Sequence, residues 1–69
     1  MRLKDVIRKL NISSRCEITI TYLCDEYAEG VEALKKEEWY RENKNCKVTD
    51  IYVGVSGHDV PEIIIGIDR

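Results

Sequence analysis

The alternation of side chains over residues 16–23 constrains this chain more than any other feature of its sequence. Apolar and polar residues follow each other with a period of two, and four in succession, Ile18 to Thr21, are β-branched. Successive side chains of a strand point to opposite faces, so the pattern predicts a strand that is buried on one side. Leu23 departs from the polar phase. Either the strand is covered on both faces near its end, or residues 24–26 turn into a short second strand at Tyr27–Ala28.

Two later segments have the same period. Lys47–Val55 and Glu62–Asp68 both alternate and are rich in β-branched residues, and the turn formers of residues 56–59 separate them. Pro61 has no backbone N–H to donate to a ladder, which favours the first residue of an outer strand. We therefore expect an antiparallel hairpin with its second strand at the outside of the sheet.

Helical patterns occupy the remaining segments. Leu3–Leu10 spaces its apolar residues at i, i+3, i+4 and i+7, as one face of a helix does. Val31–Glu42 consists almost entirely of helix formers, but its apolar stripe is short, and Trp39 and Tyr40 diverge from it. We expect the second helix to bend, fray or restart near Glu37, with at least one of the two rings free to project. The turn formers of residues 11–14 follow the first helix.

Together these elements predict a single α+β domain over residues 1–69. It has a small antiparallel sheet of three or four strands with two helices packed on one face, in the order α-β-(β)-α-β-β. The pattern leaves the order of the strands open. The expected core residues are Leu3, Val6, Ile7, Leu10, Ile18, Ile20, Leu34, Ile51, Val53, Ile63 and Ile65.

The cysteine count bears on compartment and metal binding. Three cysteines, an odd number, cannot complete a disulfide framework, which favours a reducing cytosol. No two of the cysteines form a C-x-x-C pair, and His58 is the single histidine. We therefore expect no metal site and no cofactor. Cys16 shares the apolar phase of its strand and is expected to be a small buried hydrophobe.

The chain has few side chains that could act as a nucleophile or as its general base, which argues against catalysis. Ser13, Ser14 and Ser56 lie in turn contexts, and one histidine is available to activate any of them. His58 is expected to be a solvated loop residue. No glycine-rich phosphate loop precedes a helix. We expect a protein that is not an enzyme and has no catalytic residues.

The ends and the apolar runs of the chain favour the cytoplasm. The longest uninterrupted apolar run, Ile63–Ile65, is far too short to span a bilayer, and the charged start of the chain is unlike a signal peptide. We expect no membrane contact.

Charge is distributed unevenly along the chain, although the formal net charge is only −2. Residues 1–16 contain five basic residues and one acidic residue, and residues 17–43 contain eight acidic and three basic ones. Solvated helix faces explain this without a function. The alternative is that aromatic side chains among the acids anchor a partner with a basic surface. The residues of this predicted partner site are Tyr27, Glu37, Glu38, Trp39, Tyr40 and Glu42.

The order of segments also carries a resemblance. A helix like Leu3–Leu10, a strand like Glu17–Ile20, a helix start like Glu29–Leu34 and strands like Val48–Val53 and Glu62–Ile65 follow one another. This order is similar to that of small accessory proteins of prophages and mobile elements in low-GC gut bacteria, some of which are anti-CRISPR inhibitors. The resemblance implies a non-enzymatic binder of a host or defence protein, and it transfers no functional residue.

Three functions follow as expectations. The first is a protein-binding module, including an inhibitor of a bacterial defence (CRISPR-Cas) or nucleic-acid-handling complex, without direct contact to nucleic acid. The alternative is a small nucleic-acid-binding accessory or regulatory protein whose basic N-terminal segment contacts phosphates. The third is a homodimer formed through the edge Ile63–Ile67. The basic residues of the alternative are Arg2, Lys4, Arg8, Lys9 and Arg15.

Overall fold

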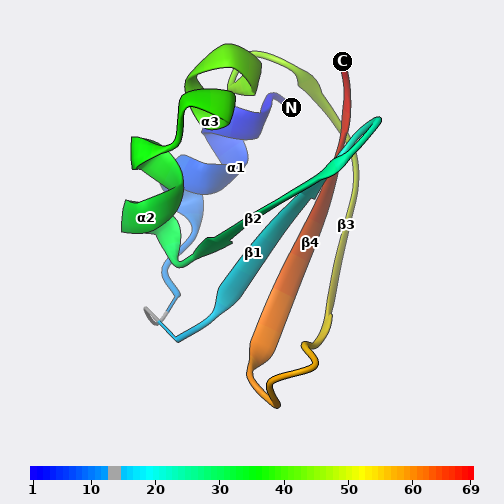
Figure 1. Cartoon of the computed structure of the whole chain (residues 1–69). Helices are drawn as coiled ribbons and strands as arrows, with labels where there is room; N and C mark the ends of the chain where they lie inside the picture. The colour runs from blue at the N-terminus through cyan, green and yellow to red at the C-terminus, as the bar shows by residue number, and fades with distance from the viewer. Residues whose placement is uncertain (13–14) are drawn as a thin grey trace.

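The computed structural model describes residues 1–12 and 15–69, and over these it has the predicted α+β fold. The elements follow one another as α1 (Leu3–Lys9), β1 (Glu17–Thr21), β2 (Asp25–Glu29), α2 (Val31–Lys36), α3 (Glu38–Asn43), β3 (Lys47–Val55) and β4 (Pro61–Asp68) (Figure 1). The short second strand is therefore present. Of the predicted turn over residues 11–14, Ser13 and Ser14 lie outside the described residues.

The four strands form one mixed sheet in the order β2-β1-β4-β3. β1 pairs antiparallel with β2, and β3 pairs antiparallel with β4, which confirms the predicted C-terminal hairpin. β1 and β4, however, run parallel, so the prediction of a purely antiparallel sheet is wrong. Parallel neighbours need a long crossover connection, and the chain from β2 through α2, α3 and β3 supplies it.

β4 lies inside the sheet, whereas the sequence indicated an outer strand. The register explains how its first residue is accommodated. Pro61 pairs only with Val55 of β3, because β1 begins one position later, with Glu17 beside Glu62. No neighbour on the β1 side therefore requires the missing N–H of the proline. The same position corrects the predicted dimer edge Ile63–Ile67: β4 lies between β1 and β3, and residues 63–66 pair with both, so β4 is not an edge strand.

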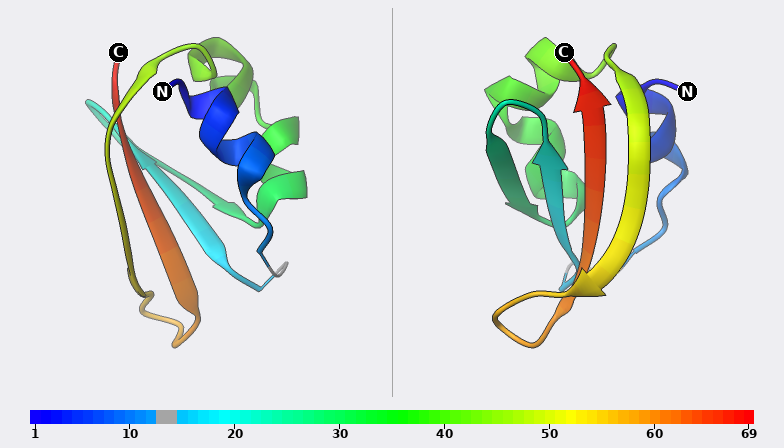
Figure 2. Two further views of the ribbon diagram at one scale, coloured as in Figure 1. Left: turned by 180° about the vertical axis from the view of Figure 1, so that it is seen from behind. Right: turned by 90° about the vertical axis from the view of Figure 1, so that its right-hand side faces the viewer.

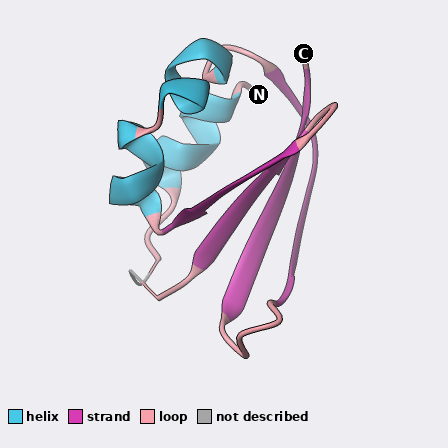
Figure 3. Ribbon diagram, viewed as in Figure 1, coloured by secondary structure: helices cyan, strands magenta, loops and turns pink. Residues whose placement is uncertain are grey.

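All three helices pack on one face of the sheet, and no described helix covers the other face (Figures 2 and 3). The predicted restart of the second helix is confirmed, so the layer holds three helices instead of two. Glu37 has an extended backbone (φ −76°, ψ 138°), ends α2 and begins α3. Among the described residues, no helix has the length and apolar character needed to cross a membrane.

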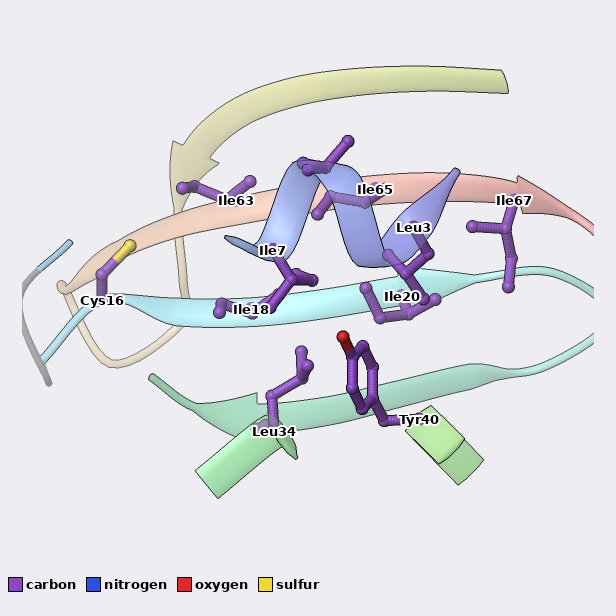
Figure 4. Packing of buried hydrophobic residues seen from close by; sticks show 12 residues of the cluster. Leu3, Ile7, Cys16, Ile18, Ile20, Leu34, Tyr40, Ile63, Ile65 and Ile67 are labelled. Carbon is purple, nitrogen blue, oxygen red and sulfur yellow. The ribbon is translucent and has the colours of Figure 1, made fainter. Parts of the chain in front are cut away.

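The core lies between the helical layer and the sheet (Figure 4). α1 packs over the two inner strands, while α2 and α3 close the side next to β2. Cys16 is buried there, as predicted, and all three cysteines are free thiols. The buried apolar residues are Leu3, Val6, Ile7, Cys16, Ile18, Ile20, Ala28, Leu34, Tyr40, Ile63, Ile65 and Ile67.

Two residues predicted for the core are instead exposed. The exposed fraction is 46% for Ile51 and 73% for Val53, and Leu10 is only half-buried. Ile51 and Val53 pair with Ile65 and Ile63 and therefore share their face of the sheet. They remain exposed because β3 is the edge strand and the helices cover the inner strands (Figure 4).

Backbone hydrogen bonds hold the start of the chain against the segment around the beginning of β3. The N–H of Leu3 donates to the carbonyl of Cys46, and that of Lys4 donates to the carbonyl of Lys44, both at 2.9 Å. The N–H of Val48 in turn donates to the carbonyl of Met1 at 2.8 Å. The first turn of α1 is therefore fixed beside the end of α3.

Candidate functional site

The six residues of the predicted partner site do not form one surface. Tyr40 is buried, with its ring in the core between α3 and the sheet (Figure 4). Trp39 is half-buried and packs against the same core. Glu37, Glu38 and Glu42 are exposed on the helical layer. The expectation of a projecting ring beside these acids is corrected for Tyr40, which is 9% exposed.

Tyr27, the sixth residue, lies on the opposite side of the molecule. Its neighbour Ala28 points into the core and is 4% exposed, so Tyr27 points to the face of the sheet that lacks helices. Tyr27 is 44% exposed there. We call this side the open face, meaning the solvent-facing side chains of β1 to β4.

The register of the strands arranges the open face in three rows. The middle row crosses all four strands as Tyr27, Thr19, Ile64 and Tyr52. Both tyrosines are about half exposed, at 44% and 52%. The row toward the β3–β4 loop consists of Glu29, Glu17, Glu62 and Gly54, and the row at the other end consists of Asp25, Thr21, Gly66 and Asp50. The open face is thus an aromatic and aliphatic strip between two acidic rows.

Hydroxyl groups organise the carboxylates of the first acidic row. The Tyr27 hydroxyl lies 2.9 Å from Oε1 of Glu17 and 3.2 Å from Oε1 of Glu29, so its single proton is shared between them. Thr19 Oγ1 donates to Oε2 of Glu62 at 2.9 Å. These contacts fix the carboxylates on the open face of the sheet. The strands that carry them are about 4.8 Å apart.

Glu17 is the best anchored of these acids and is only 6% exposed. Its burial by itself raises the pKa of the carboxyl group, but hydrogen bonds from Ser56, Tyr27 and His58 outweigh the burial and lower the pKa overall. Nδ1 of His58 lies 3.2 Å from Oε1 of Glu17. Glu17 therefore ties β1 to β2 and to the β3–β4 loop.

The sequence predicts a solvated loop residue at His58, and the side chain is 80% exposed. The sequence nevertheless missed its contact with Glu17, since the two residues are far apart in the chain and no local pattern joins them. A shallow hollow beside this pair is lined by Arg15, Glu17, Glu29, His58 and Val60. The buried carboxylate accepts hydrogen bonds from Tyr27, Ser56 and His58 of the chain itself. Within the described ranges, no group of three or more His, Cys, Asp or Glu side chains is placed to hold a metal ion.

A second charged surface lies on the helical layer. Lys4 and Arg8 of α1 converge with Lys35 of α2 and with Arg41 and Lys44 at α3, and Tyr40 also lines the hollow between them. We call this the basic groove. The hydrogen bond from the backbone N–H of Lys4 to the carbonyl of Lys44 holds the α1 side of this groove against the α3 side. For Lys4, Lys35 and Lys44, no ion pair with another described residue is found. The sequence identified the α1 half of this groove and missed the rest.

No family model, curated protein sequence or solved structure matches this chain. The two charged surfaces are therefore the features that indicate a function.

Proposed function

We propose that this chain is a cytoplasmic, non-enzymatic protein-binding module that docks its open face onto a basic surface of a host protein. The partner class is a bacterial nucleic-acid-handling complex, including a defence complex of the CRISPR-Cas type. One observation carries the proposal: an uncovered sheet face presents half-exposed tyrosines between two acidic rows.

The physical reasons are of two kinds. Tyrosine supplies a large contact area with few torsions to immobilise, which is why it is frequent at the centres of interfaces. Carboxylates around such a centre attract a basic partner and raise the association rate. Carboxylates on adjacent strands, about 4.8 Å apart, also present the closely spaced negative charge that a phosphate-binding groove accommodates.

Charge reversal tests whether the partner binds the open face or the acids around α3, which are Glu37, Glu38 and Glu42. Asp25→Lys with Glu29→Lys alters the outer strand of the open face, and the variant Glu37→Lys, Glu38→Lys, Glu42→Lys alters the α3 region. All five residues are exposed, so each variant should fold, which circular dichroism would verify. Proteins captured by the immobilised full chain from nuclease-treated host cytosol would be quantified for each variant.

We expect the open-face variant to lose the captured partner and the α3 variant to retain it. Tyr27→Ala should also weaken capture, because it removes the central ring. If only the α3 variant loses the captured partner, the interface lies at Glu37, Glu38 and Glu42, and the assignment to the sheet is wrong. Equal capture by all variants would refute docking through either acidic surface.

The basic groove favours a second candidate function, nucleic-acid binding through the helical layer. Five cationic side chains from three helical segments meet there, whereas the sequence alone offered only an N-terminal cluster. A protein that neutralises phosphates releases counterions, so its affinity for DNA or RNA falls steeply with salt.

Fluorescence anisotropy with labelled duplex DNA and single-stranded RNA, over a range of salt concentrations, separates the two candidates. The protein-binding proposal expects no binding to either nucleic acid at about 0.15 M salt. Salt-dependent binding that is lost in Lys4→Glu with Lys44→Glu, but retained in Asp25→Lys with Glu29→Lys, would establish the second candidate instead.

A further inference from the structure

The free edge of β3 is unusually apolar for the edge of a sheet. β3 spans nine residues, and its segment 51–55 (Ile-Tyr-Val-Gly-Val) contains neither a charge nor a proline. Tyr52, Val53 and Val55 are 52%, 73% and 72% exposed. Proteins commonly protect such edges with charges, prolines or bulges, because unpaired strands recruit other strands. Here Lys47, Asp50 and the irregularity between Val48 and Asp50 protect only the first part of β3.

The hairpin register shows which backbone groups of this segment face outward. The N–H of Ser56 donates to the carbonyl of Val60 at 2.9 Å, so these two residues form a hydrogen-bonded pair. The next pair, Val55 with Pro61, is then a non-hydrogen-bonded one, which agrees with the missing N–H of the proline. Because the two kinds of pair alternate, Ile51, Val53 and Val55 direct their N–H and C=O groups toward the free edge.

We propose that a second copy of this chain covers this edge, with the two β3 strands antiparallel about a twofold axis at Val53. In this register Val53 faces Val53 of the second copy, and Ile51 faces Val55 of the second copy. All of these residues direct their backbone groups outward, so the hydrogen bonds between the strands can form. The side chains that meet on this face are all apolar, and they are the exposed ones on the helical side of the sheet.

The other face of the segment favours the same register. Tyr52 falls opposite Gly54 of the second copy, and no atom lies within 4 Å of the position that a Cβ on Gly54 would take. An aromatic side chain on a neighbouring strand can cover the exposed backbone of a strand glycine. Moving the axis to Tyr52 would instead place Asp50 opposite Gly54 and the two phenol rings opposite each other.

A second copy suits this edge better than a partner with a basic surface does. A partner with a basic surface finds no carboxylate in residues 51–55, whereas an uncharged segment can face its own copy without like-charge repulsion. The opposite edge, β2, carries Asp25, Glu26 and Glu29 and would repel a second β2. β2 and β3 are the two edges of the sheet (Figure 2). Pairing at β3 would therefore join two four-stranded sheets into one and leave the acidic β2 edges at its ends. This inference does not depend on the proposed function.

Sedimentation equilibrium of the full chain tests the proposal. The mass should rise with concentration from 8.0 kDa to twice that value. The dissociation constant should be on the order of micromolar, because one pair of strands makes a small interface. Val53→Lys should give a monomer at every concentration, since two ammonium groups would meet at the axis. Leu23→Lys is the matched control: Leu23 is 97% exposed and lies outside β3, so this variant should still form the dimer.

Cross-linking tests the register and does not depend on the lysine variant folding. In a background with Cys24→Ser and Cys46→Ser, Val53→Cys should form a disulfide-linked dimer under mild oxidation, because directly paired residues are about 5.5 Å apart at Cα. Asp50→Cys should not form one. A wild-type chain that stays monomeric up to about 1 mM, well above a micromolar dissociation constant, overturns the proposal. Equal dimerisation of the Val53→Lys and Leu23→Lys variants, or cross-linking at residue 50 and not at residue 53, does so as well.

Discussion

Glu17 is a buried acid whose charge is balanced by three donors from other segments. Its pKa in the folded protein is below the ordinary value of 4.5, because the hydrogen bonds from Ser56, Tyr27 and His58 exceed the effect of burial. A lowered pKa in the folded state means that the carboxylate contributes stability above pH 4.5, and that this contribution disappears as the pH falls through the folded-state pKa. We expect Glu17→Gln to be less stable than the wild type at neutral pH, with the gap closing as the solution is acidified. Urea unfolding at pH 7 and at several values below pH 4.5 measures the gap.

Glu42→Gln serves as the control for this titration, since Glu42 is exposed on α3. At pH 7 its free energy of unfolding should lie within about 0.5 kcal/mol of the wild type, as for other exposed substitutions. If Glu17→Gln and Glu42→Gln behave alike, the hydrogen bonds around Glu17 do not contribute to stability.

Two apolar residues on the same face of the sheet should respond differently to truncation. Ile65 is fully buried on the inner strand β4, and Val53 is 73% exposed on the edge strand β3. Ile65→Ala should lower the free energy of unfolding by about 2–5 kcal/mol, because it leaves a cavity in the core. Val53→Ala should change the stability of the monomer by less than about 0.5 kcal/mol. Denaturant unfolding at low protein concentration, where the monomer predominates, checks both values. Similar losses for the two variants would mean that β3 is covered within the monomer.

At the scale of elements, the link between β2 and α2 depends on a backbone conformation that favours glycine. Gly30 is buried and has φ 94° and ψ 169°, a region that residues with a Cβ rarely adopt. Gly30→Ala should therefore destabilise the fold by about 1–3 kcal/mol. Gly57, in the β3–β4 loop, has no positive φ and no atom within 4 Å of an added Cβ, so Gly57→Ala should be close to neutral. Thermal melting of both variants compares them directly. A neutral Gly30→Ala would show that α2 can begin without this conformation.

Local elements could be predicted from the sequence because their signals are local. The period of two marked β1, β3 and β4, and the short apolar stripe marked the break at Glu37. The place of β4 between β1 and β3 could not be predicted, since it arises from pairing between distant segments such as Glu17 and Glu62. The exposure of Val53 was missed for a related reason. Alternation assigns a residue to a face of the sheet, but it does not reveal which part of that face a helix covers.

Part of the candidate site could be predicted as well. The acidic residues around Tyr27 indicate an exposed position, and Tyr27 does lie on an exposed acidic face. The prediction for Tyr40 is wrong because it assumes that Tyr40 belongs to the same helix axis as the apolar stripe of α2. The break at Glu37 gives α3 an axis of its own, and on that helix Tyr40 points to the core while Asn43 donates from Nδ2 to the carbonyl of Trp39 at 2.7 Å.

At the scale of the whole molecule, the fold gathers charges from separate segments of the chain into two surfaces. The open face carries carboxylates around a tyrosine strip, and the groove on the helical layer collects five cations. The two surfaces lie on opposite sides of one sheet, although the helical layer also carries the exposed acids Glu37, Glu38 and Glu42 outside the basic groove. The β3 segment 51–55 lies at the edge between them and is uncharged. Association through this edge therefore leaves both charged surfaces free.

A dimer joined at β3 also links stability to concentration. When the subunits separate on unfolding, the free energy of unfolding rises by about 1.4 kcal/mol per dimer for each tenfold rise in protein concentration. Each of the two chains is therefore stabilised by half of that amount. For a chain of this size, 1 kcal/mol shifts the melting temperature by about 4–8 °C. Above the dissociation constant, the wild-type melting temperature should therefore rise by about 3–5 °C per tenfold increase in concentration. Calorimetry of Leu23→Lys should show the same slope, and that of Val53→Lys should show none. A slope of zero in the wild type would mean that the chain folds and melts as a monomer, with residues 51–55 left open to solvent.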